Sequence, residues 1–203
     1  MADAMIYRTI PEQIEEHLRR DILTGVLVAD QPLREQEISA RFGVSRGPVR
    51  EVLMKLTQQG LVVSEPNKGV RVAKHASSAL RPLVTKLRRD IEVFALENIF
   101  DEITKDDIKA WSAILDQIQK ACKRGEKAAL VDFDLSFHKA IIQSHDDKDL
   151  FTLWHPIVLR MLMSYDRFGD DLLESYKEHK RILDAIKKGD KKAAIKALEA
   201  NIQ

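Results

Sequence analysis

The sequence has one cysteine, Cys122, and no long apolar run. A single cysteine cannot form an internal disulfide and agrees with a reducing compartment. No segment approaches the roughly 18 apolar residues of a membrane-spanning helix. The N-terminal segment MADAMIYRTIPEQIEEHLRR has no apolar core between its charges, so it does not look like a signal peptide. We therefore expect a cytoplasmic protein that does not interact with membranes.

An excess of positive charge is also lacking. The chain has 33 Lys and Arg residues against 32 Asp and Glu, and residues 1–75 have 11 against 10. Domains that bind nucleic acid commonly gather positive charge on one face. Composition alone therefore does not predict DNA binding, and any such prediction depends on where individual arginines lie.

The N-terminal segment, residues 1–74, combines three helical patterns with a short β-hairpin. Thr9-Ile10-Pro11-Glu12 has the capping-box pattern that starts a helix. The helices are expected at 11–24, 34–41 and 46–60. Two short valine-containing segments, at 61–64 and 70–72, are the expected strands, and they flank a turn rich in Pro, Asn and Gly. This order predicts a winged helix-turn-helix DNA-binding domain, in which the hairpin is the wing.

The C-terminal segment, residues 80–203, shows helical periodicity and no convincing strand. Its six helices are expected near 80–100, 105–123, 126–144, 147–166, 170–188 and 190–203. Residues 75–79 interrupt the pattern and are the expected linker. The predicted fold class is mainly α, with an N-terminal winged helix-turn-helix followed by an all-α six-helix bundle that binds an effector and dimerises.

The strongest sequence signal for DNA binding lies in the third helix. Arg46 and Arg50 are four residues apart, so they share one helical face, opposite the apolar stripe that begins at Val49. This is the N-terminal end of the helix, where helix-turn-helix proteins contact bases, and arginine donors match O6 and N7 of guanine. The alternative is that both arginines are ordinary solvated charges on a surface helix.

Small and polar residues around these arginines support the DNA-binding interpretation. Ser45 and Gly47 leave room for a phosphate to approach. Lys68, at the tip of the wing, is placed to contact the minor groove or the backbone, whereas Asn67 is equally explained as a polar turn residue.

Residues 33–63, LREQEISARFGVSRGPVREVLMKLTQQGLVV, resemble the winged helix-turn-helix of the GntR family. The resemblance implies that Arg46 and Arg50 contact bases and that the wing around Gly69 enters the minor groove. One departure is visible, because the family commonly has arginine where Gln36 lies between two glutamates. We include Gln36 and its neighbour Arg34 among the expected DNA contacts, and the operator is expected to differ from the family's commonest one.

The C-terminal segment resembles the effector domain of the FadR subfamily, the FCD type, and its six helices are most similar to the VanR-like subgroup. The motifs that carry the resemblance are LRRDIE at 87–92, DLSFH at 134–138 and EHKRILDAI at 178–186. It implies that Arg88 contacts the carboxylate of a small organic acid. The alternative for Arg88 is an ion pair with Glu92 four residues on.

Helical spacing places three metal-ligating residues on apolar seams. Asp134 lies on a seam with Leu130, Phe137 and Ile141, His138 is one turn further on, and His179 lies on a seam of a later helix. An Asp and two His residues that converge inside a bundle can bind a divalent metal, with Zn, Ni and Mn not distinguished. Alternatively, each histidine is buried and satisfied by hydrogen bonds.

The resemblance also implies a fourth metal ligand. Metal-binding members of the family use one Asp and three His, and the last of these falls at Asn201 in this chain. Asparagine is a poor ligand, so the expected site is completed by water or by an acid ligand, or else the pocket contains no metal.

Together these features predict a DNA-binding transcriptional regulator, and specifically a repressor. A homodimer is expected, since one recognition helix covers only half of an inverted-repeat operator. Two alternatives remain open at this point: a metal-dependent hydrolase that uses Asp134, His138 and His179 to activate water, and a regulator whose bundle only dimerises. No phosphate-binding glycine loop, nucleophile elbow or HExxH motif is present, so an enzyme is not expected.

Overall fold

The computed structural model describes residues 9–74, 77–163 and 171–202. The chain folds into two compact units, Met1–His75 and Ala76–Gln203. Parts of several predicted features fall outside the described residues: the start of the N-terminal domain at 1–8, the start of the linker at 75–76, the end of the helix expected at 147–166, the first residue of the helix expected at 170–188, and the last residue of the helix expected at 190–203.

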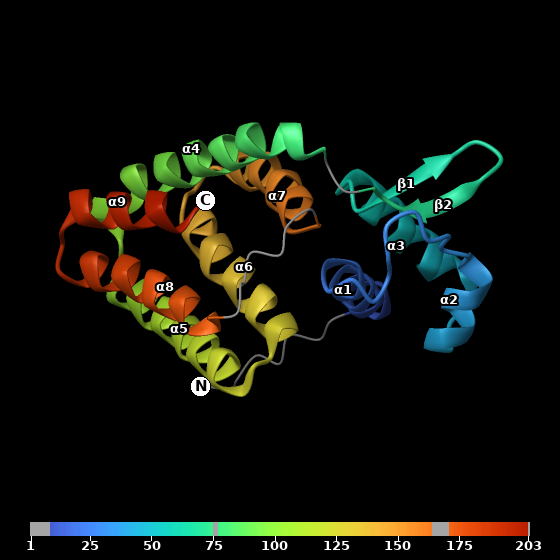
Figure 1. The fold of residues 1–203 in the computed structure, drawn as a ribbon, viewed down its shortest axis with the longest axis horizontal. Helices are drawn as coiled ribbons and strands as arrows, with labels where there is room; N and C mark the ends of the chain where they lie inside the picture. Colours follow the sequence, from blue (N-terminus) through green and yellow to red (C-terminus); the bar gives the residue numbers. More distant parts are fainter. Residues whose placement is uncertain (1–8, 75–76, 164–170, 203) are drawn as a thin grey trace. The chain divides into compact units, whose positions relative to one another are not determined.

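The first unit is a winged helix-turn-helix (Figure 1). Its elements are α1 (Ile10–Leu23), α2 (Glu35–Phe42), α3 (Arg46–Gln58), β1 (Val62–Glu65) and β2 (Gly69–Val72). Helix α1 starts at the capping box of Thr9 and Glu12 that the sequence predicts. The apolar residues of α1 pack on α3, and α2 also packs on α3. The buried residues shared by α1 and α3 are Ile14, Leu18, Ile22, Val49, Val52, Leu53 and Leu56.

The wing is fastened to the segment that precedes α2. Strands β1 and β2 pair antiparallel, with Val62 opposite Val72, and each strand extends one residue nearer to the turn than the sequence predicts. On the other edge of β2, the Leu33 amide donates to the Val70 carbonyl at 2.8 Å, and the Val72 amide donates to the Gln31 carbonyl at 2.9 Å. These hydrogen bonds couple the position of the wing to the start of α2.

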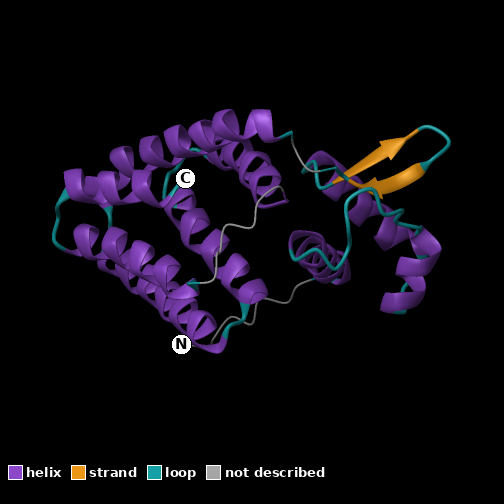
Figure 2. Cartoon of the chain, in the orientation of Figure 1, coloured by secondary structure: helices purple, strands orange, loops and turns teal. Residues whose placement is uncertain are grey.

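The second unit contains six α-helices and no strand among its described residues (Figure 2). They are α4 (Arg81–Ile99), α5 (Lys105–Arg124), α6 (Lys127–Gln143), α7 (Lys148–Met163), α8 (Leu172–Lys187) and α9 (Lys191–Asn201). Two short 3-10 turns, Ser78–Leu80 and Phe100–Glu102, flank α4 and were not predicted. The mainly α fold class, with a winged helix-turn-helix followed by a helical bundle, is confirmed.

The packing of the bundle brings α4, α6 and α8 around one core. Helix α5 packs on α6 and α8, α8 packs on α9, and α9 and α7 both pack on α4 (Figure 1). Helix α6 crosses the unit and contacts α4, α5 and α7. No helix in the part of the chain that the structure describes is long and apolar enough to cross a membrane.

Candidate DNA interface and buried polar cluster

The turn between α2 and α3 exposes the N-terminal end of α3. Gly43 ends α2 with φ of 65°, a left-handed conformation that glycine adopts without steric cost. Ser45 occupies the N-cap position of α3, as predicted, but its hydroxyl makes no capping hydrogen bond. Arg46, Gly47 and Arg50 are all exposed on the turns that follow.

Arg50 makes a two-point ion pair that the sequence analysis did not predict. Its Nε donates to Glu35 Oε1 and its Nη2 donates to Glu35 Oε2, both at 3.0 Å. The hydrogen bonds from Arg50 lower the pKa of the Glu35 carboxyl, and the positive charges of Arg50 and Arg46 act in the same direction. The carboxylate is therefore ionised at neutral pH and fixes one edge of the guanidinium.

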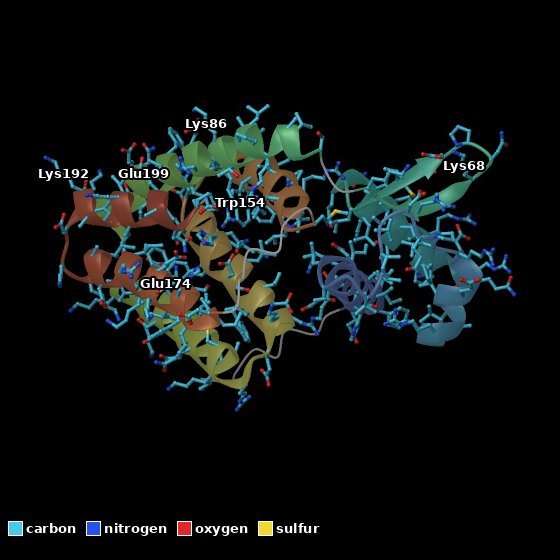
Figure 3. All side chains as sticks on the ribbon, viewed as in Figure 1. Lys68, Lys86, Trp154, Glu174, Lys192 and Glu199 are labelled. Carbon is cyan, nitrogen blue, oxygen red and sulfur yellow. The ribbon has the colours of Figure 1, made fainter. Side chains whose placement is uncertain are left out.

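The other predicted DNA contacts are also exposed, and several lie together. Arg34 pairs with Glu37 at 2.9 Å, and Lys68 pairs with Glu65 at 2.8 Å near the tip of the wing (Figure 3). Arg34, Lys68 and Gly69 line one groove of about 400 Å³ between the start of α2 and the wing. The fold thus brings the wing residues beside the residues that open α2, although more than thirty positions separate them in the chain.

The second unit contains a cluster of polar side chains with no exposure to solvent. Asp134 and His138 lie on α6, His179 lies on α8, and each is fully buried. Ligand atoms of the three residues all lie within 4.8 Å of one another. His179 Nε2 is 3.2 Å from Asp134 Oδ1, and His138 Nε2 is 4.0 Å from the same oxygen. The structure therefore brings together the three residues that the sequence singled out on separate seams.

Hydrogen bonds at Nδ1 determine which nitrogen of each histidine faces this cluster. His138 Nδ1 is 2.5 Å from a carboxylate oxygen of Glu92, and His179 Nδ1 is 2.7 Å from the carbonyl of Ser175. Both partners accept hydrogen bonds, so each Nδ1 carries a proton, and a neutral imidazole in this tautomer has its lone pair on Nε2. Neither Nε2 has a hydrogen-bond partner among the described residues.

This arrangement fits a bound cation. With neutral imidazoles, the two Nε2 atoms and a carboxylate oxygen of Asp134 are the lone-pair donors that a divalent cation binds, and they all lie within 4.8 Å of one another. Close acceptors repel each other, and a divalent cation at their centre would convert that repulsion into coordination. The Nδ1 bonds of the histidines to acceptor groups are the usual supporting contacts of metal-binding histidines.

Glu92 of α4 is the hub of the buried polar network, although its spacing in the sequence indicates only a partner for Arg88. Its carboxylate accepts from Arg88 Nε at 2.7 Å, from His138 Nδ1 at 2.5 Å and from Trp154 Nε1 at 2.8 Å. Trp154 lies on α7, where that helix faces α4 and α6 (Figure 3). The buried stripe along α4, which includes Thr85, Arg88 and Glu92 at 3-4 spacing, is the signal that could have located Glu92.

Charges in this network are set by burial and by Arg88. Burial is the largest single influence on Glu92 and would raise its pKa, but the interactions with Arg88 and His138 together outweigh desolvation and lower the pKa to about 2. Burial lowers the pKa of His138, and this effect is larger than the opposite effect of the Glu92 charge, so the pKa falls to about 4. At neutral pH the network therefore contains an ion pair between Arg88 and Glu92 and a neutral His138.

Arg88 keeps one donor group available inside the unit. Its Nε is used by Glu92, and its Nη1 is 3.7 Å from Met161 Sδ. Its Nη2 is buried and has no hydrogen-bond acceptor among the residues described. The ion pair with Glu92, which the sequence analysis gave as the alternative role of Arg88, is therefore present, and a donor remains for a further anionic group.

Asn201 lies at the C-terminal end of α9 and is buried. Its Nδ2 donates to Glu178 Oε2 at 3.2 Å, so α9 contacts α8 beside His179. Arg89 of α4 donates through Nη2 to the Ile202 carbonyl at 2.6 Å and attaches this end of α9 to α4. The end of α9 that carries Asn201 is thus attached to both α8 and α4.

A winged helix-turn-helix joined to a helical domain with a buried polar cluster defines a DNA-binding transcriptional regulator. Comparison with known families agrees with this class. Residues 10–72 match the family of bacterial regulatory proteins called the gntR family, and residues 84–203 match the FCD domain. The chain belongs to the GntR family, in its FadR-like FCD subfamily. It is a transcriptional regulator and not an enzyme, so the hydrolase alternative has no support.

Curated relatives align over most of the chain. The HTH-type transcriptional repressor RspR of Escherichia coli K12 is 29% identical over 198 residues, which cover 96% of this chain and 86% of the relative. The gluconate operon transcriptional repressor of Bacillus subtilis 168 is 26% identical over 199 residues and covers 93% of this chain and 80% of its own length.

Solved structures show the same fold. Escherichia coli McbR/YncC superposes with a TM-score of 0.82 at 20% identity, covering 97% of this chain and 95% of that chain. A GntR-type regulator from Rhodococcus sp. RHA1 superposes with a TM-score of 0.77 at 20% identity, covering 95% and 93%.

Proposed function

We propose that this chain is a homodimeric repressor whose affinity for an inverted-repeat operator is controlled by a small carboxylate effector, bound in the α4–α9 unit beside a divalent metal. Relatives named as repressors of the gluconate operon and, in Paenarthrobacter nicotinovorans, of D-xylose utilization support the sign of regulation. The observation that carries the sensing half is the buried convergence of Asp134, His138 and His179.

Asp134, His138 and His179 would hold the metal, and the Asn201 amide oxygen is a weaker fourth ligand. A bound divalent cation would supply positive charge and coordination positions for an anionic ligand. This set of nitrogen and oxygen donors suits several metals, so the choice among Zn, Ni and Mn is left to measurement.

Arg88 would bind the carboxylate of the effector through Nη2. The guanidinium is already oriented by Glu92 at 2.7 Å, and the open Nη2 is buried, where a hydrogen bond between charged groups is strong. The Glu92 carboxylate also contacts His138, so it connects Arg88, which would bind the effector, with a residue that would bind the metal.

Dimerisation would use the exposed face of α4. This face presents Leu83, Leu87 and Phe94, which are 53%, 41% and 50% exposed and follow helical spacing. Its exposed charges run from basic at Lys86, which projects outward in Figure 3, to acidic at Glu97. Antiparallel pairing of two α4 helices would therefore cover the apolar residues and place opposite charges together, as an isologous interface requires.

Metal titration tests the sensing half of the proposal. Protein stripped with a chelator is titrated with Zn²⁺, Ni²⁺ and Mn²⁺ while its thermal unfolding is followed. A ligand at 100 times its Kd stabilises the folded state by about 2.7 kcal/mol. We expect a clear rise in Tm that His179→Ala abolishes and that His145→Ala, a half-buried histidine outside the cluster, retains. No rise with any of the three metals contradicts metal binding.

Selection from random double-stranded DNA tests the DNA-binding half. The purified chain should enrich an inverted repeat, and Arg50→Ala should weaken binding to that sequence about tenfold if Arg50 contacts a guanine. If no inverted repeat is enriched, the repressor proposal fails.

A further inference from the structure

We propose that Glu35 is a specificity-determining residue, which positions Arg50 for guanine and keeps its guanidinium away from the phosphate backbone. The inference rests on the proposed function, since it requires Arg50 to face DNA. Its basis is the two-point contact in which Arg50 Nε and Nη2 each donate to one oxygen of Glu35 at 3.0 Å.

The contact uses one edge of the guanidinium and leaves the other open. Arginine has five N–H donors, one on Nε and two on each Nη. Glu35 takes the Nε donor and one Nη2 donor. The remaining Nη1 and Nη2 donors form the distal edge, a fork whose spacing matches O6 and N7 of guanine. Glu35 therefore fixes the guanidinium plane while the edge that suits guanine stays available.

Most of the Arg50 side chain is exposed, so this distal edge is accessible from solvent. The Arg50 side chain is 66% exposed, whereas Glu35 is 31% exposed and lies in the first turn of α2. A helix N-terminus favours a carboxylate, so the element that carries Glu35 also stabilises its charge. A rigid helical residue thus holds a long side chain whose tip would otherwise sample many rotamers.

The charge of Glu35 also acts against unspecific binding. A phosphate attracts any nearby arginine without regard to sequence, and such contacts dominate binding to random DNA. The negative charge of Glu35 partly neutralises Arg50 and repels phosphate. Arg50 should therefore contribute more to discrimination between bases than to binding of random DNA.

Arg34 and Glu37 provide a matched control on the same helix. This pair has one contact at 2.9 Å, and its side chains are 72% and 61% exposed. Exposed ion pairs with a single contact contribute little to stability. Glu37→Gln removes the same charge as Glu35→Gln from the same turn of α2, without removing a two-point contact.

The experiment compares the wild type with Glu35→Gln, Glu37→Gln, Arg50→Ala and the double variant Glu35→Gln/Arg50→Ala. Binding is measured by fluorescence anisotropy at fixed salt, for the selected operator and for operators with each guanine replaced in turn. The specificity ratio is the affinity for the operator divided by that for the replaced sequence. We expect Glu35→Gln to lower this ratio about fivefold or more at the guanine that Arg50→Ala identifies. Glu37→Gln should change the ratio less than about twofold.

Glu35 is a positioning residue only if it acts through Arg50, so Glu35→Gln should have no further effect on the ratio in the Arg50→Ala background. An unchanged ratio in Glu35→Gln, an equal fall in Glu37→Gln, or a further fall in the double variant overturns the inference. Absence of an enriched operator for the wild type instead contradicts DNA binding itself, and the inference falls with it. Thermal unfolding of each variant verifies that the fold is retained.

Discussion

Glu92 has three hydrogen-bond donors around its carboxylate and no contact with solvent. A buried carboxylate is costly unless its charge is compensated, and Arg88 provides that compensation. The same carboxylate holds the proton of His138 on Nδ1, which leaves Nε2 to face Asp134. A single residue on α4 therefore determines both the orientation of Arg88 and the tautomer of His138.

Glu92→Gln tests this role. The substitution leaves the Arg88 charge buried without an anionic partner, and breaking a buried ion pair in this way costs about 3–5 kcal/mol. Urea unfolding should show a loss of that order in the free energy of unfolding. The control is Glu97→Gln on the exposed face of the same helix, which should stay within about 0.5 kcal/mol of the wild type. A loss in Glu92→Gln no larger than in this control would contradict the hub role.

Gly47 offers a second test at the scale of one residue. A Cβ at this position meets no atom within 4 Å, and its φ is not in the left-handed region, so the fold does not require glycine there. Gly47→Ala should leave stability unchanged or raise it by up to about 1 kcal/mol. If the DNA backbone approaches here, a lost charged hydrogen bond of about 1.5 kcal/mol lowers operator affinity about tenfold.

Gly43→Ala is the contrasting variant. Gly43 has φ of 65°, where a Cβ is strained, so alanine should destabilise the folded unit by about 1–2 kcal/mol. Denaturant unfolding and operator binding, measured side by side, separate the two glycines. A Gly47→Ala variant with unchanged operator affinity would show that no close approach to DNA occurs at this residue.

Among the elements, α4 has a proposed function on each of two opposite faces. Its buried face presents Arg88 and Glu92 to the core, and its exposed face presents Leu83, Leu87 and Phe94. A surface with several large apolar side chains on one helix is typical of an interaction site. Arg88, proposed to bind the effector, and the proposed dimer interface therefore lie on one helix.

Leu87→Glu should disrupt the proposed dimer. A charge at the centre of an apolar interface costs about 2 kcal/mol or more, which weakens association at least about thirtyfold. Light scattering after size-exclusion chromatography, over a range of protein concentrations, should show a monomer where the wild type is a dimer. Leu173→Glu on α8 is the control, because Leu173 is 43% exposed and lies on a different helix from Leu87, which is 41% exposed. Retention of the dimer in Leu87→Glu would exclude this face.

For the molecule as a whole, the buried network links stability to pH. The pKa of His138 falls from 6.5 to about 4 on folding, and that of Glu92 falls from 4.5 to about 2. In both cases the unfolded chain binds protons at a higher pH than the folded chain does. The free energy of unfolding therefore decreases on acidification, first between pH 6.5 and 4 through His138, then between pH 4.5 and 2 through Glu92.

The His138 contribution can be isolated. Urea unfolding of the metal-free protein should show a loss on the order of 3 kcal/mol between pH 7 and pH 4 from this histidine. His138→Gln removes the titrating group, so its stability should change less over the same interval. If the two proteins lose stability in parallel, His138 is not the group responsible.

Much of the fold could be predicted because its signals are local. The capping box at Thr9, the left-handed turn at Gly43 and the six helical periods after residue 80 depend on neighbours within one or two turns. Helical spacing also placed Asp134 and His138 on the buried face of α6 and His179 on that of α8. The residue types predict that these faces meet. In the fold α5 packs on both α6 and α8, which holds the two faces together.

Local sequence specifies the helices, their apolar faces and the residue types that carry chemistry, because periodicity and capping act over a few residues. Which of these groups meet depends on the tertiary structure. Three such meetings join different elements: Glu35 pairs with Arg50, Arg34 lines a groove with the wing, and Glu92 contacts His138 and Trp154. Spacing along one helix cannot specify them, because they depend on how elements distant in the chain pack against each other.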